Sequence, residues 1–413
     1  MELRKGKVVA ICCCSESAFV RAHLWAIGQG RISLLVPQTE WRQLSVLATM
    51  FDKFTVLTDD PSNQILLPFE LEDAEIFTEK ILPPSTLWPD PLAILLTSGT
   101  TGTPKPVVKS VIAMLGEIES LRKVMNIDTD SCFVSTVPFE HMFGYSFGFW
   151  LPHLAQVRLD PKRVFLPIEL KTLCNNSTTP LWIVTTPVHL RAYVELKIKF
   201  KNIAGVVCAT SPLSSALARQ AAYCFGVPIT EIYGSTETGA IAFRKRHADE
   251  DQEPWWSPLP GMTIQLDEGG VAQCQSSHLD GVIPLGDRIE LDVTGFRILG
   301  RTGDIVKVYG KRQSRTALNN MISSVPGVVD ASYFFHNDGE CNQETSRPIA
   351  FVVLERGATI PEVLAHIRGR VDDVFLPRPI FVVKSLPRSE TGKLGDIDLR
   401  NLYRMCKARN ATT

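Results

Sequence analysis

The sequence lacks a strong charge of either sign: 43 Lys and Arg residues stand against 44 Asp and Glu residues, and the formal net charge is −1. A chain with so little net charge has no bulk electrostatic attraction to nucleic acid or to an anionic membrane surface. No apolar run comes near the roughly 20 residues that a helix needs to cross a bilayer. We therefore expect neither a nucleic acid nor a membrane as a partner.

A second absence concerns the 10 cysteines, among which no Cys-x-x-Cys pair occurs. The adjacent residues Cys12 to Cys14 lie in the apolar run 8–14, which predicts a buried strand rather than a metal or redox site. Scattered, unpaired thiols are typical of the reducing cytosol. Residues 1–14 begin like a signal peptide, but an apolar part of about seven residues followed by Ser15 and Glu16 is too short for one. We expect a soluble, cytoplasmic protein.

What is present is the composition of an ordinary globular enzyme, with 45% hydrophobic and 21% charged residues in a chain of 413. That length is enough for two to three domains. Short apolar runs alternate with segments of helical periodicity in the N-terminal part, which predicts parallel sheets with crossover helices. The expected strands are 8–14, 32–36, 54–57, 92–96, 132–137, 181–185 and 205–210, and the expected helices are 17–28, 41–51, 111–125 and 214–225.

The pattern changes between residues 264 and 289 to short strands with Gly-containing turns, which indicates an antiparallel, barrel-like region. We place the domain boundary at 300–304. The predicted fold is α/β: a large N-terminal domain (1–300) has parallel αβ sheets and a small barrel-like β region, and a small α+β C-terminal domain (301–413) follows on a hinge. In the C-terminal domain we expect strands at 305–308, 331–335, 349–354 and 381–383, and helices at 316–325 and 361–371.

The stretch from Leu92 to Lys109 organises the rest of the chain. A short apolar strand leads into a run of Gly, Ser and Thr at 97–103, followed by Pro104 and Lys105. Small residues let backbone N–H groups converge on one point, and a lysine adds positive charge, so the run predicts a cradle for polyphosphate. Its spacing is not that of the G-x-x-x-x-G-K-[ST] loop, which argues against a P-loop kinase or ATPase. An ordinary solvated turn stays open as the alternative.

Four further clusters carry polar residues suited to a nucleotide. Tyr233 could stack on a purine, and Glu237 offers the oxygen ligand that Mg²⁺ prefers. Asp287 could accept two ribose hydroxyls, and Arg301 could contact ribose or phosphate. Lys393, beside a glycine on a tight loop, could neutralise charge that develops on a carboxylate and a phosphate. Each residue also has an ordinary explanation. Tyr233 could be a loop aromatic and Glu237 a solvated carboxylate. Asp287 could be a turn aspartate, Arg301 could pair with an acid, and Lys393 could be a surface lysine.

Taken together, five segments resemble in order and rough spacing the motifs of the adenylate-forming superfamily. That superfamily includes acyl- and aryl-CoA synthetases, nonribosomal peptide adenylation domains and beetle luciferases. The segments are T-S-G-T-T-G-T-P-K at 97–105, Y-G-S-T-E at 233–237, G-D at 286–287, G-R-T-G-D-I-V-K at 300–307 and P-R-S-E-T-G-K at 387–393. The resemblance covers the chain from Val8 to its end. It implies a ligase that uses ATP and Mg²⁺ and a C-terminal domain that rotates about its hinge between two half-reactions.

The resemblance also implies roles for the matching positions. The loop that handles the β- and γ-phosphates is Thr97, Ser98, Gly99, Thr100, Thr101, Gly102 and Lys105. The residues around the α-phosphate and the adenine are Thr236 as a phosphate contact, Glu237 as the Mg²⁺ ligand, and Tyr233 with the backbone of Ala209, Thr210 and Ser211 as the adenine slot. The remaining positions are Asp287 and Arg301 at the ribose, His141 at the acid pocket and Lys393 as the catalytic lysine of adenylation.

Four features depart from the pattern of the superfamily. Pro106 stands where a glycine usually follows the loop lysine, and it should stiffen the exit of the loop. Residues 209–211 replace a Gly-Gly-Ala run, so the adenine slot is expected to be narrower. Gly303 stands at the hinge where Asp or Lys is common. Only 96 residues precede Thr97 in the printed sequence, so the outer helices that usually lead the first domain are not expected.

Two segments narrow the resemblance further. W-W-S-P-L-P-G at 255–261 and V-K-V-Y-G-K-R at 306–312 are similar to a small bacterial subgroup, the ligases of aryl-polyene and related pigment or fatty-acid-like clusters. That subgroup implies transfer of an acid to the phosphopantetheine thiol of an acyl carrier protein. Nothing in the residues separates this acceptor from free coenzyme A. A non-catalytic acyl- or nucleotide-binding relative is the alternative from another class.

The acid itself is expected to be small and aromatic or unsaturated, because aromatic residues are dense between 139 and 150. The expected lining of the acid pocket is His141, Phe143, Tyr145, Phe149, Thr210, Ile232 and Gly239. A well-packed core helix explains the same aromatic residues equally well, and both readings stay open.

Overall fold

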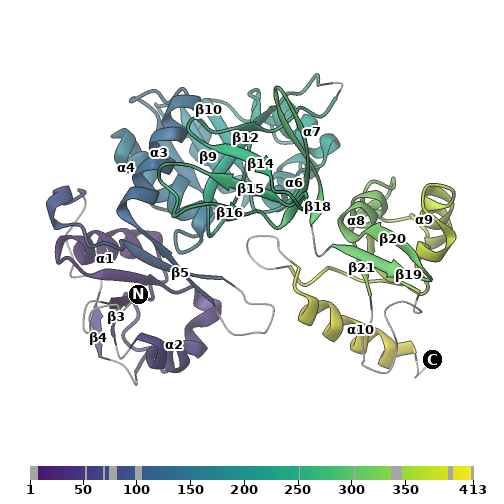
Figure 1. Ribbon diagram of the computed structural model, residues 1–413, viewed down its shortest axis with the longest axis horizontal. Helices are drawn as coiled ribbons and strands as arrows, with labels where there is room; N and C mark the ends of the chain where they lie inside the picture. Colours follow the sequence, from purple (N-terminus) through teal and green to yellow (C-terminus); the bar gives the residue numbers. More distant parts are fainter. Residues whose placement is uncertain are drawn as a thin grey trace. The chain divides into compact units, whose positions relative to one another are not determined.

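The computed structural model describes residues 8–51, 54–67, 70–73, 81–97, 105–250, 252–301, 304–335, 347–388 and 394–410 (Figure 1). The chain divides into two compact units. The first consists of Met1–Ile264 and Cys274–Ile283, and the second of Gln265–Gln273 and Pro284–Thr413. The predicted functional division after residue 300 stays a prediction.

The first unit begins with a six-stranded sheet in the order β4-β3-β1-β2-β5-β6. All of its neighbouring strands are parallel except β5 and β6, which are antiparallel. The strands are β1 (Val8–Ile11), β2 (Ile32–Leu35), β3 (Thr55–Thr58), β4 (Leu71–Asp73), β5 (Ala93–Thr97) and β6 (Lys105–Lys109). The helical elements are α1 (Glu16–Gly28), η1 (Gln38–Gln43), α2 (Leu44–Phe51) and η3 (Ser85–Leu87).

Helices cover both faces of this sheet, because its central strands β1 and β2 are buried at every position. Val8 and Ala10 of β1 pack with Leu44 and Leu47 of α2 on one face. Successive side chains of a strand alternate between faces, so Ser33 of β2 points to the other face. There it meets α1, whose His23 lies 2.8 Å from the Ser33 hydroxyl. Runs that are buried on both faces are expected of parallel strands.

The second sheet of this unit has seven strands in the order β13-β12-β11-β10-β9-β7-β8. Its strands are β7 (Cys132–Ser135), β8 (Arg158–Asp160), β9 (Leu181–Thr185), β10 (Ile203–Cys208), β11 (Ile229–Ser235), β12 (Gly239–Arg246) and β13 (Ser257–Pro258). Strands β7 to β11 are parallel to their neighbours, and β12 and β13 continue the sheet as antiparallel strands. The helical elements are α3 (Val111–Val124), η4 (Gly144–Trp150), α4 (Leu151–Ala155), α5 (Pro167–Asn176), α6 (Pro187–Glu195) and α7 (Ser215–Phe225).

A buried polar contact joins α1 of the first sheet to η4 of the second. The two ring nitrogens of His23 lie 2.8 Å from the Ser33 hydroxyl and 3.0 Å from the Tyr145 hydroxyl. None of the His23 or Tyr145 side chain is exposed. Element η4 is a π-helix, and its Gly144 packs so tightly that a Cβ there would lie 2.0 Å from the Pro138 carbonyl oxygen.

Short strands follow between residues 263 and 301, as the pattern between residues 264 and 289 predicts, and the last two of them are antiparallel. These are β14 (Thr263–Leu266), β15 (Ala272–Gln275) and β16 (Ile283–Pro284), in the order β14-β15-β16, and the pair β17 (Asp287–Asp292) and β18 (Gly295–Arg301).

The rest of the second unit is a small α+β fold with a core of its own. The pair β19 (Ile305–Val308) and β20 (Lys311–Ser314) is followed by a three-stranded sheet of order β21-β22-β23. The remaining elements are β21 (Val328–Phe334), β22 (Ile349–Leu354), β23 (Ile380–Val382), α8 (Arg315–Ser323), α9 (Ile360–Ile367), η5 (Asp373–Phe375) and α10 (Asp396–Asn410). The predicted fold class, with parallel αβ sheets and a separate small α+β part, is confirmed. No helix within the described ranges is both long and apolar enough to span a bilayer.

Candidate functional site

Segments with predicted roles leave neighbouring strands of the seven-stranded sheet at the same edge. Cys208, the last residue of β10, pairs with Glu231 of the parallel strand β11. The predicted adenine-slot segment 209–211 follows β10 directly, and Tyr233 lies just beyond Glu231. Because parallel strands end at one edge, the topology brings these segments together. The segment that contains His141 follows β7 at that same edge, since β7 is parallel to β9 and β9 to β10.

A tight turn between β11 and β12 carries Thr236 and Glu237. The Ser235 and Thr238 side chains fix it, because the Ser235 N–H donates to Thr238 Oγ1 at 3.1 Å and the Thr238 N–H donates to Ser235 Oγ at 3.2 Å. A bulge interrupts the pairing after Tyr233. At Gly234 a Cβ would lie 2.0 Å from the Gly239 carbonyl oxygen, so the glycine of Y-G-S-T-E is required by the close approach of two backbones.

The Glu237 carboxylate is exposed, and its oxygens accept no hydrogen bond from the described residues. Across the described ranges no three His, Cys, Asp or Glu side chains gather into a possible metal site. A single hard oxygen ligand on a fixed turn fits Mg²⁺, which usually takes one or two carboxylates and completes its octahedron with phosphate and water. The residue present at this position therefore fits the ion that the motif implies.

The predicted phosphate loop lies between the antiparallel strands β5 and β6. Thr97 and Lys105 face each other at its base, where the Thr97 hydroxyl donates to the Lys105 carbonyl oxygen at 3.2 Å. Lys105 is exposed. Pro106 lies on β6, an edge strand, where a missing N–H costs the sheet little. The predicted loop residues Ser98, Gly99, Thr100, Thr101 and Gly102 lie outside the described residues.

The predicted adenine slot contains one strained residue and one supported ring. Thr210 has a φ of 84°, a left-handed conformation that a β-branched residue rarely adopts and that explains why glycine is usual at this position. The Tyr233 ring lies 5.6 Å from the Trp256 ring, and the Arg244 guanidinium lies 4.2 Å from the centre of that indole. Tyr233 is thus backed by an aromatic and cationic stack.

Beneath the slot, buried charges tie the two segments together. Glu231 Oε2 accepts from Arg244 Nε at 2.8 Å and from an Arg246 guanidinium nitrogen at 3.0 Å. Arg246, which is fully buried, also donates to the Leu213 carbonyl oxygen at 3.3 Å. The network fastens the chain after β10 to strands β11 and β12.

The aromatic segment that was expected to line the acid pocket is largely core. Tyr145 and Phe149 are fully buried, and both rings pack against His23. They therefore present no surface to a ligand, as the core-helix alternative anticipates. His141 and Phe143 are half-buried, so of these four residues they are the ones whose placement suits contact with an acid.

A polar cluster lies between β7 and β9, and its residues are not among those predicted from the sequence. The Thr136 hydroxyl lies 3.1 Å from the Thr185 hydroxyl and 3.3 Å from His189 Nδ1, and that nitrogen lies 2.9 Å from the Thr186 hydroxyl. Chain connections diverge at this point of the sheet, since β7 leads to β8 on one side and β9 leads to β10 on the other. Such a switch point is where open α/β sheets commonly bind ligands. The strand order that creates it is not visible in the sequence.

The second unit contains the remaining predicted residues. Asp287 begins β17, Arg301 ends β18, and the two residues are register partners. Lys393 lies outside the described residues, but the flanks of its loop are described. Arg388 pairs with Leu394 across the loop, and its guanidinium donates to both carboxylate oxygens of Asp330 at 2.8 Å.

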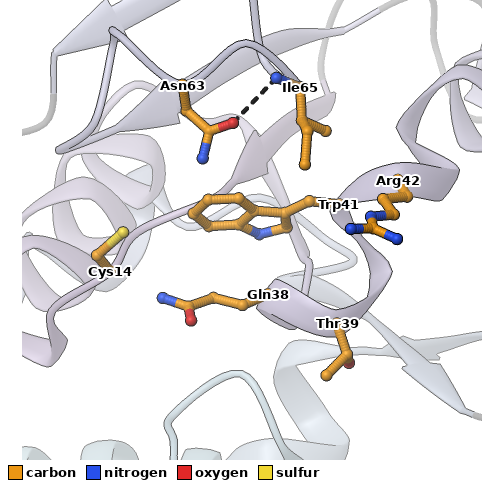
Figure 2. Close-up of a pocket in the computed structure, with 7 residues that line it drawn as sticks. All are labelled: Cys14, Gln38, Thr39, Trp41, Arg42, Asn63 and Ile65. Atoms are coloured by element: carbon orange, nitrogen blue, oxygen red, sulfur yellow. Dashed lines mark hydrogen bonds between the residues drawn. The ribbon is translucent and has the colours of Figure 1, made fainter.

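A pocket of about 480 Å³ lies at the carboxyl edge of the six-stranded sheet (Figure 2). None of the predicted site residues lines it. The Trp41 ring crosses it between the Gln38 and Asn63 side chains. The nearby N-terminus of α1 already holds a carboxylate, because the Cys14 and Ser15 N–H groups donate to Asp59 at 2.6 and 3.1 Å. The N-terminus of α1 is therefore not open to a phosphate.

Comparisons with known proteins agree with the fold and the motifs. Residues 25–274 match the family model of AMP-binding enzymes, and residues 318–393 match the model of the AMP-binding enzyme C-terminal domain. A 4-coumarate–CoA ligase from Cereibacter sphaeroides is 27% identical over 308 residues, which are 73% of this chain and 69% of that protein. A medium-chain fatty-acid–CoA ligase from Escherichia coli is 24% identical over 348 residues, 75% of this chain and 60% of that protein.

A solved structure with a similar fold is o-succinylbenzoate coenzyme A synthetase from Bacillus subtilis in complex with ATP and magnesium ion. Its TM-score is 0.80 at 18% identity, and the match covers 96% of this chain and 90% of that one. At this identity the likeness concerns the fold. Since the first family model covers more than half of the chain, the chain belongs to the AMP-binding enzyme family, within the adenylate-forming superfamily that its motifs resemble.

Proposed function

We propose that this chain is an ATP-dependent acid–thiol ligase. It activates a small carboxylic acid as an acyl adenylate and transfers the acyl group to the phosphopantetheine thiol of an acyl carrier protein. The observation that carries the proposal is the shared edge of β10 and β11. The segment 209–211 follows β10 at this edge, and β11 leads through Tyr233 to the turn with Thr236 and Glu237. Membership in the AMP-binding enzyme family supports the same reading.

In the first half-reaction, a carboxylate oxygen of the acid attacks the α-phosphorus of ATP. The new bond joins that oxygen to phosphorus, the bond between the α-phosphorus and the bridging oxygen breaks, and pyrophosphate leaves. Thr236 contacts the α-phosphate, Lys105 and its loop hold the departing phosphates, and Lys393 neutralises the charge that develops. Such transfers depend mainly on positioning and on charge stabilisation, which these residues supply.

Glu237 holds the metal in this proposal. Mg²⁺, when bound, offsets negative charge on the phosphate oxygens. The task of the protein is to keep the Glu237 carboxylate in place, and the hydrogen bonds between Ser235 and Thr238 serve that purpose.

In the second half-reaction a thiol attacks the acyl carbonyl, and AMP leaves. We propose that the β19–β20 hairpin serves this step; its turn residues Tyr309 and Gly310 have φ values of 47° and 80°. These angles fit the tight turn that matches strand twist, and the Tyr309 side chain is exposed at the tip of the hairpin. Free coenzyme A is the second candidate acceptor, and the names of both curated relatives favour it.

The acid is proposed to be aromatic or unsaturated, as in the aryl-polyene type of pathway. The 4-coumarate–CoA ligase relative supports this class, while the fatty-acid–CoA ligase relative has an aliphatic acid in its name. We propose that the half-buried His141 and Phe143 and the polar cluster around His189 recognise a polar substituent of the acid.

Two assays test the proposal. The first assay measures the exchange of pyrophosphate into ATP in the presence of an added acid. This exchange requires the first half-reaction, so a non-catalytic binding protein shows no exchange. Thioester formation is then compared with holo acyl carrier protein and with coenzyme A at equal thiol concentration. If thioester forms faster with coenzyme A, coenzyme A and not the carrier protein is the acceptor. If neither thiol gives a thioester, the ligase assignment is wrong.

A further inference from the structure

The stretch that opens with the phosphate loop ends in a second lysine, Lys109, which the proposed mechanism does not use. Lys109 is the last residue of β6, and only 2% of it is exposed. Its Nζ donates to the backbone carbonyl oxygen of Glu237 at 3.1 Å, across 128 residues of sequence. A buried ammonium group therefore holds the backbone of the residue whose side chain is proposed to bind Mg²⁺.

A buried carboxylate meets the same turn from the other side. Glu117 lies in the second turn of α3, which begins just after Lys109 with Ser110 as its N-cap. Only 2% of Glu117 is exposed, and its Oε1 accepts from the Ala240 N–H at 2.9 Å. Lys109 and Glu117 thus bracket the turn, one bonded before Thr238 and the other after Gly239.

The turn packs closely against the Glu117 side chain. Gly239 has a φ of 71°, and a Cβ on it would lie 2.5 Å from Glu117 Oε2. Glu117 therefore fills the space that a side chain at 239 would take. Together with the bonds between Ser235 and Thr238, these contacts hold the turn at residues 235, 237, 238 and 240.

The two buried charges stabilise each other as well as the turn. Burial lowers the pKa of Lys109, and the carboxylates of Glu117 and Glu237 oppose that shift. Burial likewise raises the pKa of Glu117, against the effect of Lys109 and the Ala240 N–H. A hydrophobic pair would fill the same volume at no desolvation cost, so stability alone does not account for buried charges here. Their hydrogen bonds to the turn backbone indicate that they hold the turn in place.

We propose that Lys109 and Glu117 are positioning residues that clamp the 236–240 turn and so hold the Glu237 carboxylate in place for Mg²⁺ and ATP. The metal part of this inference rests on the proposed function. The clamp part rests only on the contacts of the first unit.

Hydrogen exchange tests the clamp without any activity. Lys109→Met, Glu117→Met and the double variant are compared with Glu119→Gln/Lys123→Met, which removes an exposed ion pair of 2.9 Å from the same helix. Loss of a hydrogen bond to a charged group should speed amide exchange across residues 234–241 by about tenfold or more in all three clamp variants. The Glu119/Lys123 control should match the wild type. Wild-type exchange in the double variant would overturn the clamp.

Equilibrium binding of ATP over a Mg²⁺ titration, with no acid present, tests the metal part. We expect the Mg²⁺ concentration for half-maximal ATP binding to rise about tenfold in the clamp variants and to stay unchanged in the control. The double variant separates positioning from folding, because neutralising both partners restores thermal stability relative to the single variants. Restored stability with a wild-type Mg²⁺ midpoint would show that the pair is merely structural.

The two experiments also separate this inference from the proposed function. If the wild type binds no ATP at any Mg²⁺ concentration, the proposed function fails and the metal part fails with it. The exchange result on residues 234–241 still decides whether the clamp exists. If the wild type binds ATP normally and the variants keep its Mg²⁺ midpoint, the proposed function stands and the metal part of the inference is wrong.

Discussion

Asp287 and Arg301 lie directly opposite each other across the antiparallel strands β17 and β18. Their Cα atoms are therefore neighbours at about 4.5–5.5 Å, the spacing of such pairs. Two residues that separate motifs predict to contact the ribose are thus cross-strand partners in one hairpin. Residues 14 apart in sequence meet because β17 and β18 are joined by a tight turn at Asp292 to Gly295.

This pairing makes Asp287→Ala an informative change. If Asp287 bonds the ribose as its motif predicts, loss of this charged partner should raise the KM for ATP about tenfold or more, with a smaller effect on kcat. Asp292→Ala, at the other end of β17, is the matched control and should behave as the wild type. Steady-state exchange kinetics measure both. An unchanged KM in Asp287→Ala would remove this residue from the nucleotide site.

Gly239→Ala tests the packing of Glu117 against the 236–240 turn. The new methyl group would displace the Glu117 carboxylate, whose Oε2 lies 2.5 Å from the Cβ position. Gly226→Ala is a suitable control, because Gly226 has a similar φ of 70° but no atom within 4 Å of its Cβ position. Both variants bear the left-handed strain of about 1–2 kcal/mol, and only Gly239→Ala adds a clash. We expect a larger loss of unfolding free energy in urea for Gly239→Ala, and equal losses would contradict the close contact.

Arg388→Ala tests whether the Asp330 pair supports the loop that contains Lys393. The bidentate contact is partly buried, with 28% of the Arg388 and 15% of the Asp330 side chain exposed. Its removal should loosen one flank of the loop and slow acid-dependent exchange about tenfold, while thioester formation from supplied acyl adenylate is kept. The control is Arg370→Ala, an exposed arginine of the same unit. Equal slowing of both half-reactions would argue for a general loss of structure.

Acid should destabilise the first unit through His23. Burial, with a smaller effect of His153, lowers the pKa of His23 from 6.5 to about 3. The folded state therefore binds fewer protons than the unfolded state, and stability falls as the pH drops below about 6.5. Between pH 7 and pH 5 this amounts to about 2 kcal/mol. His23→Gln, which cannot be protonated, should lose that much less stability over the range. Parallel pH dependences for the two proteins, followed by urea unfolding, would refute the assignment.

Much of the secondary structure could be predicted, because apolar runs and helical periodicity are local properties. Strands β9, β19 and β22 have the predicted bounds. Helix α10 is not among the predicted helices, because its many charged residues conceal the helical spacing of Leu399, Leu402, Tyr403 and Cys406, which pack on the core. Strand β6 was missed because Pro106 and two lysines conceal its pattern, which an edge strand tolerates.

The site was less accessible from the sequence. Motif residues identify segments, but the edge that they share depends on strand order, which is not a local property. The bonds from Lys109 to Glu237 and from Glu117 to Ala240 span 128 and 123 residues. Neither lysine nor glutamate carries a local signal of burial, since both types are usually exposed. Tyr145 and Phe149 show the converse: their aromatic pattern fits a pocket and a core equally, and only packing distinguishes the two.

The most direct measurement is radiolabelled pyrophosphate exchange into ATP, run over a panel of aryl, enoyl and alkyl acids with the wild type and Lys393→Ala. We expect exchange that depends on one class of acid in the wild type and near-total loss of it in Lys393→Ala. That variant should still form thioester from supplied acyl adenylate. Exchange that needs no acid, or wild-type exchange in Lys393→Ala, would contradict the assignment of this chain as an adenylate-forming ligase.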